Sequence, residues 1–140
     1  MVCRHPLTDF DMRKQYHLRK SAAGLLAWDV DRLIALTADL APRAVPLASI
    51  RELDEPFWFD GGGEAATCRA VADHARLINE ADLRYPIILG ADGRVMDGMH
   101  RVAKAYLEGR EVIAALQLAV DPPPDFVGVD EAELPYESAP

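Results

Sequence analysis

Apolar residues recur at helical spacing in three parts of the chain. The first pattern begins after Asp29, whose side chain can accept hydrogen bonds from a helix start, and it stops before Pro42. The second covers about residues 64–79, and the third begins near Met99 and ends at Gly109, a residue type that favours helix C-termini. The pattern therefore predicts three amphipathic helices. In the second, the predicted inner stripe is Ala65, Cys68, Val71, Ala72, Ala75 and Ile78, with His74 on the surface.

Strand-like patterns alternate with these helices. Residues 45–50 contain Pro46, which suits an edge strand because proline donates no ladder hydrogen bond. Residues 85–96 read as a β-hairpin in which Gly93 takes the positive φ of a tight turn, and residues 112–120 supply a last strand. The order of helices and strands predicts an α/β (α+β) fold with a small mixed sheet flanked by helices.

The remaining segments lack a regular pattern. Residues 1–24 are basic and predict an irregular arm ahead of a domain over residues 25–120. Residues 51–59 are acidic and aromatic and precede three glycines, which predicts a loop. Residues 121–140 are acidic and rich in proline, so we expect an extended or disordered tail.

Length and charge exclude several classes of protein. The chain has 140 residues, enough for one domain, and its 15 basic against 23 acidic residues give a net charge of −8. That charge disfavours a nucleic-acid partner. No apolar run of about 18 residues suggests a membrane span, and the charged first 20 residues contain no signal-peptide core. With only two cysteines, Cys3 and Cys68, we expect a cytoplasmic protein.

The segment Asp97-Gly-Met-His-Arg101 carries the strongest chemical signal, because it follows a predicted strand and opens a predicted helix. A glycine there exposes the free N–H groups of the helix start, which bind anions, and Arg101 can grip two phosphate oxygens. A purely structural interpretation stays open for this short motif. In it, Gly98 permits a tight turn, Asp97 caps the helix and Arg101 is solvated.

Over a longer window, residues 45 to about 118, the order of motifs resembles the ParB/sulfiredoxin superfamily. The strand Val45-Pro-Leu-Ala-Ser-Ile50, the hairpin Asp92-Gly-Arg-Val-Met-Asp97 and the signature Gly98-Met-His-Arg101 carry the resemblance. In that family the signature binds nucleotide phosphates, reading Gly-Cys-His-Arg in sulfiredoxins and Gly-Glu-Arg-Arg in ParB proteins. The resemblance implies a nucleotide site at Gly98, Met99, His100 and Arg101, for ATP, ADP or CTP.

Two differences between this sequence and the family pattern argue against two of the family's functions. Met99 stands where sulfiredoxins have their reactive cysteine, and a thioether cannot act as a thiolate nucleophile, so sulfiredoxin activity is excluded. Nothing after residue 120 has the pattern of the DNA-binding domain of a partition protein.

Free-serine kinases of the superfamily carry an acidic residue after the first strand that acts on the acceptor hydroxyl. The resemblance assigns that catalytic role first to Glu55 and second to Glu52, while a solvated acidic loop is the alternative. Asp97 and Asp92 are the candidate Mg²⁺ ligands, although a helix cap and a turn are their commoner roles.

These observations predict a nucleotide-binding domain, with Mg²⁺-dependent nucleotide hydrolysis or phosphotransfer as the activity. One alternative is a non-enzymatic module with a vestigial phosphate site, which contacts a protein partner through residues 57–59 or the acidic tail. Another is an accessory nucleic-acid-binding protein. Trp58 is a candidate for stacking on a base. His5, His17 and His74 show no metal-ligand spacing and receive no role.

Overall fold

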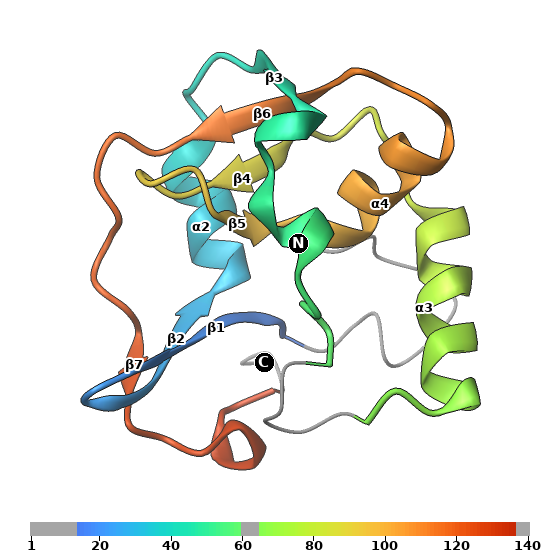
Figure 1. Cartoon of the computed structure of the whole chain (residues 1–140). Coiled ribbons are helices and arrows are strands. Elements are labelled where there is room, and N and C mark those ends of the chain that lie inside the picture. The colour runs from blue at the N-terminus through green and yellow to red at the C-terminus, as the bar shows by residue number, and fades with distance from the viewer. Residues whose placement is uncertain (1–13, 60–64, 137–140) are drawn as a thin grey trace.

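The computed structural model describes residues 14–59 and 65–136, in which the strands form two sheets (Figure 1). The first sheet has the order β1-β2-β7, all antiparallel, with β1 (Tyr16–Ser21), β2 (Gly24–Asp29) and β7 (Phe126–Val127). The second has the order β3-β6-β4-β5, with β3 (Arg43–Pro46), β6 (Val112–Gln117), β4 (Ile87–Leu89) and β5 (Val95–Asp97). In it β4 and β6 run parallel, whereas β3–β6 and β4–β5 are antiparallel.

In the described part of the chain, three α-helices and three short 3-10 turns connect these strands. The helices are α2 (Val30–Thr37), α3 (Cys68–Glu80) and α4 (Met99–Leu107). The turns are η1 (Leu47–Ser49), η2 (Arg51–Asp54) and η3 (Glu131–Glu133). The architecture is a mixed α+β fold, as the pattern predicts. Among residues 14–59 and 65–136, no helix is both long and apolar enough to cross a membrane.

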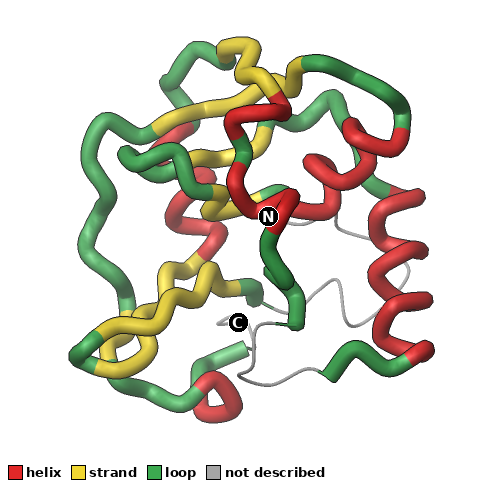
Figure 2. Tube along the Cα trace, viewed as in Figure 1, coloured by secondary structure: helices red, strands yellow, loops and turns green. Residues whose placement is uncertain are grey.

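The second sheet is the centre of the molecule, because successive residues of β4 and β5 point to opposite faces and both faces are covered. One face packs on α4, through Ile87, Leu89, Val95, Val102 and Ala105. The other packs on β2 and α2, through Ile88, Met96, Trp28 and Leu33. Figure 2 shows α2 leading from the first group of strands to the second.

Several local predictions are confirmed. Helix α2 begins after Asp29, whose carboxylate accepts a hydrogen bond from the Asp31 N–H at 2.9 Å. The predicted hairpin is β4–β5, and Gly93 has a φ of 85° in its turn. Helix α4 ends at Leu107, just before Gly109 with a φ of 73°. In each case the signal was a residue within the turn or cap itself.

The prediction of an irregular N-terminal arm is wrong for residues 14–24, since β1 and β2 form a regular hairpin with Tyr16 opposite Asp29. Apolar Tyr16 and Leu18 alternate with polar residues in β1, a strand period that the many basic side chains hide. Gly24, with a φ of 100°, closes the turn. Residues 1–13 and the glycines at 61–63 lie outside the described residues.

Of the two alternatives predicted for the tail, extended or disordered, the structure has an extended segment that packs on the first sheet over part of residues 121–136. The tail uses the open edge of β2, where β7 pairs, and the Trp28 Nε1–H donates to the Pro122 carbonyl at 2.8 Å. Asp125 accepts from the Asp29 N–H and from Arg32, and Leu134 is buried. A segment too polar to build its own core can be ordered by an existing sheet edge. Residues 137–140 are outside the described part.

Three other expectations need smaller corrections. The strand predicted over 45–50 is an edge strand only to Pro46, after which η1 begins, and residues 51–54 form η2 rather than a loop. Helix α3 does not bury the predicted stripe, because Cys68 is exposed and Val71 is 51% exposed. Its inner face carries the buried Ala70 and the half-buried His74, Leu77 and Ile78, of which only Ile78 belongs to the predicted stripe.

His17 in β1 packs beside the buried Trp28, with 5.5 Å between ring centroids. The Arg19 guanidinium lies 5.1 Å from the centroid of the Trp28 ring and 3.7 Å from Asp121. Burial, reinforced by the Arg19 charge, lowers the pKa of His17 to about 4. His17 is therefore neutral at neutral pH.

Candidate functional site

The turn from β5 into α4 requires a glycine. Gly98 has a φ of 106°, and a β-carbon there would lie 2.7 Å from the Ile87 Cγ2 atom. The turn lets α4 start directly behind β5, and residues 97–101 are all buried. Strand, glycine turn and helix start thus occur in the predicted order.

The Arg101 guanidinium points into the protein and is engaged there. Its Nη2 lies 2.9 Å from Asp97 Oδ2, and its Nη1 donates to the carbonyls of Tyr85 and Pro86 at 2.8 Å each. Both side chains of the ion pair are 4% exposed. Arg101 therefore ties the start of α4 to the segment before β4. A phosphate would have to compete with Asp97 for this cation.

The other two members of the signature differ from each other. The Met99 side chain packs in the core beside Val102, so it offers a ligand only its backbone N–H. His100 is 4% exposed and has one ring nitrogen, Nδ1, without a hydrogen-bond partner among the described residues.

The structure does not bring the two predicted Mg²⁺ ligands together. Asp97 is buried against Arg101, whereas Asp92 lies in the exposed hairpin turn and accepts the Arg94 N–H at 3.0 Å. That hydrogen bond lowers the pKa of Asp92. Within residues 14–59 and 65–136, no group of three His, Cys, Asp or Glu side chains could hold a metal ion. The carboxylates at 92 and 97 thus do not fit Mg²⁺.

The acidic residues of the 51–59 segment occupy different environments. Both Glu55 oxygens bind Arg94 Nη1, at 2.7 and 2.8 Å, and Glu55 is exposed. Glu52 is 4% exposed; its Oε2 accepts the Val95 N–H at 2.8 Å, and its Oε1 has no partner among the described residues. Glu52 thus covers the open edge of β5 with one oxygen and keeps the other uncommitted.

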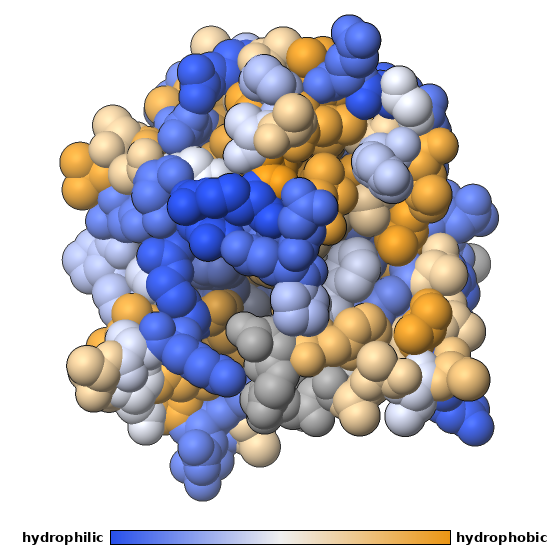
Figure 3. All heavy atoms as spheres, in the orientation of Figure 1, coloured by the Kyte–Doolittle hydropathy of each residue, from blue (hydrophilic) through white to orange (hydrophobic). Residues whose placement is uncertain are grey.

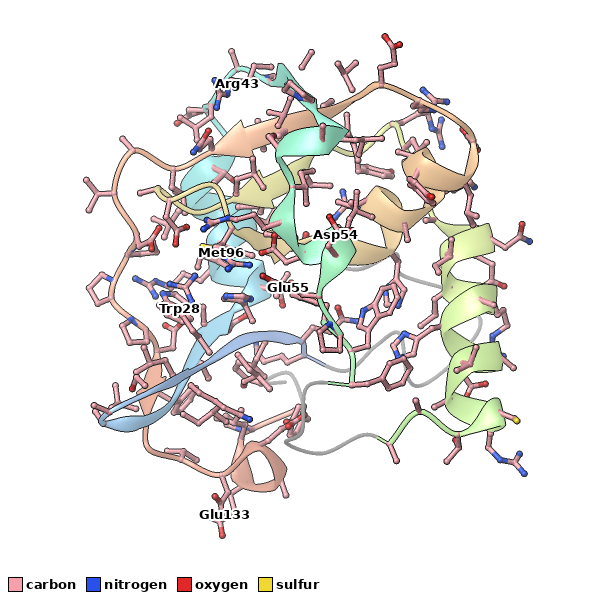
Figure 4. All side chains as sticks on the ribbon, viewed as in Figure 1. Trp28, Arg43, Asp54, Glu55, Met96 and Glu133 are labelled. Carbon is pink, nitrogen blue, oxygen red and sulfur yellow. The ribbon has the colours of Figure 1, made fainter. Side chains whose placement is uncertain are left out.

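Figure 4 places Asp54 and Glu55 in front of β5 and α4, and the same central region is hydrophilic in the space-filling view of Figure 3. The hydrogen bond of Glu52 to Val95 and the contact of Trp58 with His100 confirm that this segment lies against the start of α4. Residues 52–58 therefore form one wall of the candidate site.

Trp58 of this wall forms a stacked cluster with two histidines, His74 of α3 and His100 of α4. The Trp58 ring stacks on His74 at 4.5 Å and on His100 at 4.6 Å between centroids. His74 Nδ1 lies 2.8 Å from His100 Nε2. Burial, followed by the neighbouring His74 and Arg101, lowers the pKa of His100 to about 3, so His100 is neutral at neutral pH.

Sequence reasoning gave His74 no role and placed it on the surface. The signal that could have found it is its helical spacing from Ala70, the one buried residue of α3.

Comparisons with protein-family models, with curated proteins and with solved structures found no match for this chain. The resemblance to the ParB/sulfiredoxin superfamily therefore stays a prediction. The chemistry of the site has to be argued from its own residues.

The arrangement combines three kinds of group around one helix start. The first turn of α4 supplies N–H groups at the positive end of the helix dipole. Glu52 Oε1 is an acceptor, and His100 Nδ1 is either a donor or an acceptor, depending on its tautomer. Buried polar atoms that find no protein partner are the atoms most able to bind a ligand, since the ligand would satisfy them.

Proposed function

We propose that this protein binds a nucleotide, with the phosphates at the start of α4 and a hydroxyl group of the ligand on Glu52. The observation that carries the proposal is a pair of buried atoms near that helix start, Glu52 Oε1 and His100 Nδ1, which have no hydrogen-bond partner among the described residues. Leaving a buried polar group unsatisfied costs about 1–3 kcal/mol. A ligand that satisfies both atoms recovers this cost on binding.

The charges at the start of α4 and at Glu52 favour different groups of a ligand. A phosphate is favoured at the N–H groups of α4 and beside His100, because the helix dipole is positive there. Glu52 repels phosphate but accepts a hydrogen bond from a hydroxyl. The Val95 N–H donates to Glu52, and Val95 is three residues from Gly98 at the start of α4. Three residues of extended chain span about 10 Å, so Glu52 is anchored within about that distance of the helix start. A nucleotide carries both groups at such a separation.

Glu52 is favoured over Glu55 as the residue that meets the ligand. Arg94 Nη1 binds both Glu55 oxygens and lies 3.8 Å from Glu52 Oε2, whereas Glu52 Oε1 has no hydrogen-bond partner among the described residues. A carboxylate beside a ligand hydroxyl is also where a general base would be needed for phosphoryl transfer to that hydroxyl. The proposal contains no metal step, because Asp92 and Asp97 do not converge.

Docking of a protein partner through residues 57–59 has less support. Trp58 stacks on both histidines, and Phe59 contacts His74 edge-on at 5.4 Å, so these rings are engaged within the protein. The other expected docking segment, the tail, also has partners within the protein: β7 pairs with β2, and the Lys14 N–H donates to the Tyr136 carbonyl at 2.8 Å.

Binding is tested by titrating the protein with ATP, ADP, CTP, GTP and inorganic phosphate while following tryptophan fluorescence. We expect a saturable change with at least one nucleotide, because Trp58 lies on His100. Glu52→Gln keeps an acceptor for the Val95 N–H but removes the carboxylate, and it should weaken binding at least tenfold. Glu55→Gln is the matched control and should leave the affinity within threefold of wild type.

Two results would overturn the proposal. One is the absence of binding to every ligand at millimolar concentration by folded wild-type protein. The other is equal affinity of Glu52→Gln and wild type, which would confine Glu52 to covering the edge of β5.

A further inference from the structure

His74 holds His100 in one orientation. The two imidazoles are joined by the 2.8 Å contact between His74 Nδ1 and His100 Nε2, and their planes are 20° apart. Trp58 lies against both rings, at interplanar angles of 19° and 14°. A flip of the His100 ring would break the contact between the two nitrogens and disturb the stack. The unpartnered Nδ1 is bonded to Cγ and is therefore the ring nitrogen nearer to the backbone of α4.

A neutral imidazole carries one N–H and one lone pair, so the contact with His74 fixes what His100 Nδ1 can do. If His74 donates its Nδ1–H, the His100 Nε2 is the acceptor and the His100 proton is on Nδ1. If His100 donates from Nε2, its Nδ1 is a bare acceptor. The first state can bind a phosphate oxygen, which only accepts hydrogen bonds, and the second cannot.

We propose that His74 is a positioning residue that donates its Nδ1–H to His100 Nε2, so that His100 offers Nδ1–H to a phosphate oxygen at the start of α4. This inference rests on the proposed function, since it names the donor that the phosphate meets. It assigns a role to α3, which otherwise buries only Ala70. The proposal also explains a neutral histidine at an anion site: a fixed N–H replaces a positive charge.

Nitrogen-15 NMR of histidine-labelled protein without ligand reads the tautomer directly. We expect the His100 resonances to show Nδ1 protonated and Nε2 unprotonated at neutral pH, with a His100→Gln variant assigning the signals. A protonated Nε2 with a bare Nδ1 would overturn the proposal. This measurement does not depend on any ligand.

The second test uses ATP as the probe and a pair of His74 variants. His74→Phe keeps a ring for the stack with Trp58 but has no N–H. His74→Asn places an amide nitrogen at the same number of bonds from the backbone as Nδ1. Because no N–H on residue 74 then holds the His100 proton on Nδ1, His74→Phe should weaken ATP binding about tenfold. His74→Asn should restore the affinity to within threefold of wild type.

The outcomes separate the two proposals. Equal affinity of His74→Phe and wild type, with melting temperatures and Trp58 fluorescence unchanged, overturns the role of His74 but leaves nucleotide binding intact. If wild-type protein binds no nucleotide or phosphate, the proposed function fails. The tautomer found by NMR then decides whether His74 orients His100: Nδ1–H supports it, and Nε2–H overturns it.

Discussion

Acidification from about pH 7.5 to about pH 5 should cost this protein a large part of its stability through two histidines, the half-buried His17 and the buried His100. In the folded state, the pKa of His17 is lowered to about 4 and that of His100 to about 3, mainly by burial. The unfolded chain has ordinary histidines with a pKa near 6.5. As the pH falls through that value, the unfolded state takes up protons and the folded state does not. Stability is therefore complete above about pH 6.5 and declines below it.

The size of the effect follows from the same pKa values. At about pH 5, protonation favours the unfolded state by about 2 kcal/mol for each histidine. The unfolded histidine is protonated at that pH, whereas both folded pKa values lie at least one unit below pH 5, so the folded histidine is not. Together His17 and His100 account for about 4 kcal/mol, against a total stability of about 5–15 kcal/mol for a typical domain. In unfolded chains Asp and Glu have pKa values of about 3.9 and 4.3, below this pH window, so histidine is the side chain that titrates most within it.

Urea unfolding at the two pH values measures the effect. With a slope of about 1.5 kcal/mol per molar urea, the midpoint should fall by about 2.5 M on acidification. His17→Gln and His100→Gln should each reduce the pH-dependent loss by about 2 kcal/mol, whatever they do to stability at neutral pH. A loss below 1 kcal/mol in wild type, or an unchanged loss in both variants, would refute the assignment to these two side chains.

Three substitutions test other parts of the structure. Glu52→Gln should weaken nucleotide binding but leave the free energy of unfolding unchanged or raise it by about 1 kcal/mol, because it removes a buried charge with one unpartnered oxygen. A loss above about 1 kcal/mol in urea unfolding would contradict this. Gly98→Ala should lower the free energy of unfolding by about 2 kcal/mol more than Gly93→Ala in thermal unfolding. Both glycines have a positive φ, but only at Gly98 would a β-carbon meet close neighbours, so equal losses would contradict the clash. Arg101→Ala should lower the free energy of unfolding by about 3–5 kcal/mol, because it removes the Arg101 partner of the buried Asp97. The double variant Arg101→Ala, Asp97→Ala should recover part of that loss, and strictly additive losses would argue against an interaction between the two side chains.

The parts of the fold that the sequence predicts are those encoded by neighbouring residues. The glycine turn at Gly98 and the cap at Asp29 each depend on atoms within a few residues, so the pattern reveals them. The hairpin of β1 and β2 is also local, but the basic side chains of β1 hide its strand period. The strand β7 near the C-terminus gains its hydrogen bonds only from β2, about 100 positions earlier, so its own residues do not reveal it.

The site divides in the same way. The position of the motif at a helix start could be predicted, because strand, glycine and helix follow one another. The direction of the Arg101 side chain could not, because its partners include the carbonyls of Tyr85 and Pro86, 16 and 15 residues away. The pairing of His74 with His100 joins residues 26 positions apart on two helices. Only the packing of those helices reveals it.

The pairing of β2 with β7 has a consequence for how the chain folds during synthesis. Leu26 lies opposite Val127, so the first sheet joins residues 101 positions apart. The Trp28 side chain likewise has no Pro122 carbonyl to donate to until that part of the chain is made. At about 5–20 residues per second, the ribosome needs about 5–20 s to make the intervening chain. During that time the edge of β2 is open, and a chaperone or a neighbouring nascent chain can occupy the place that β7 later takes. The last strand to be made is thus the one that closes the first sheet.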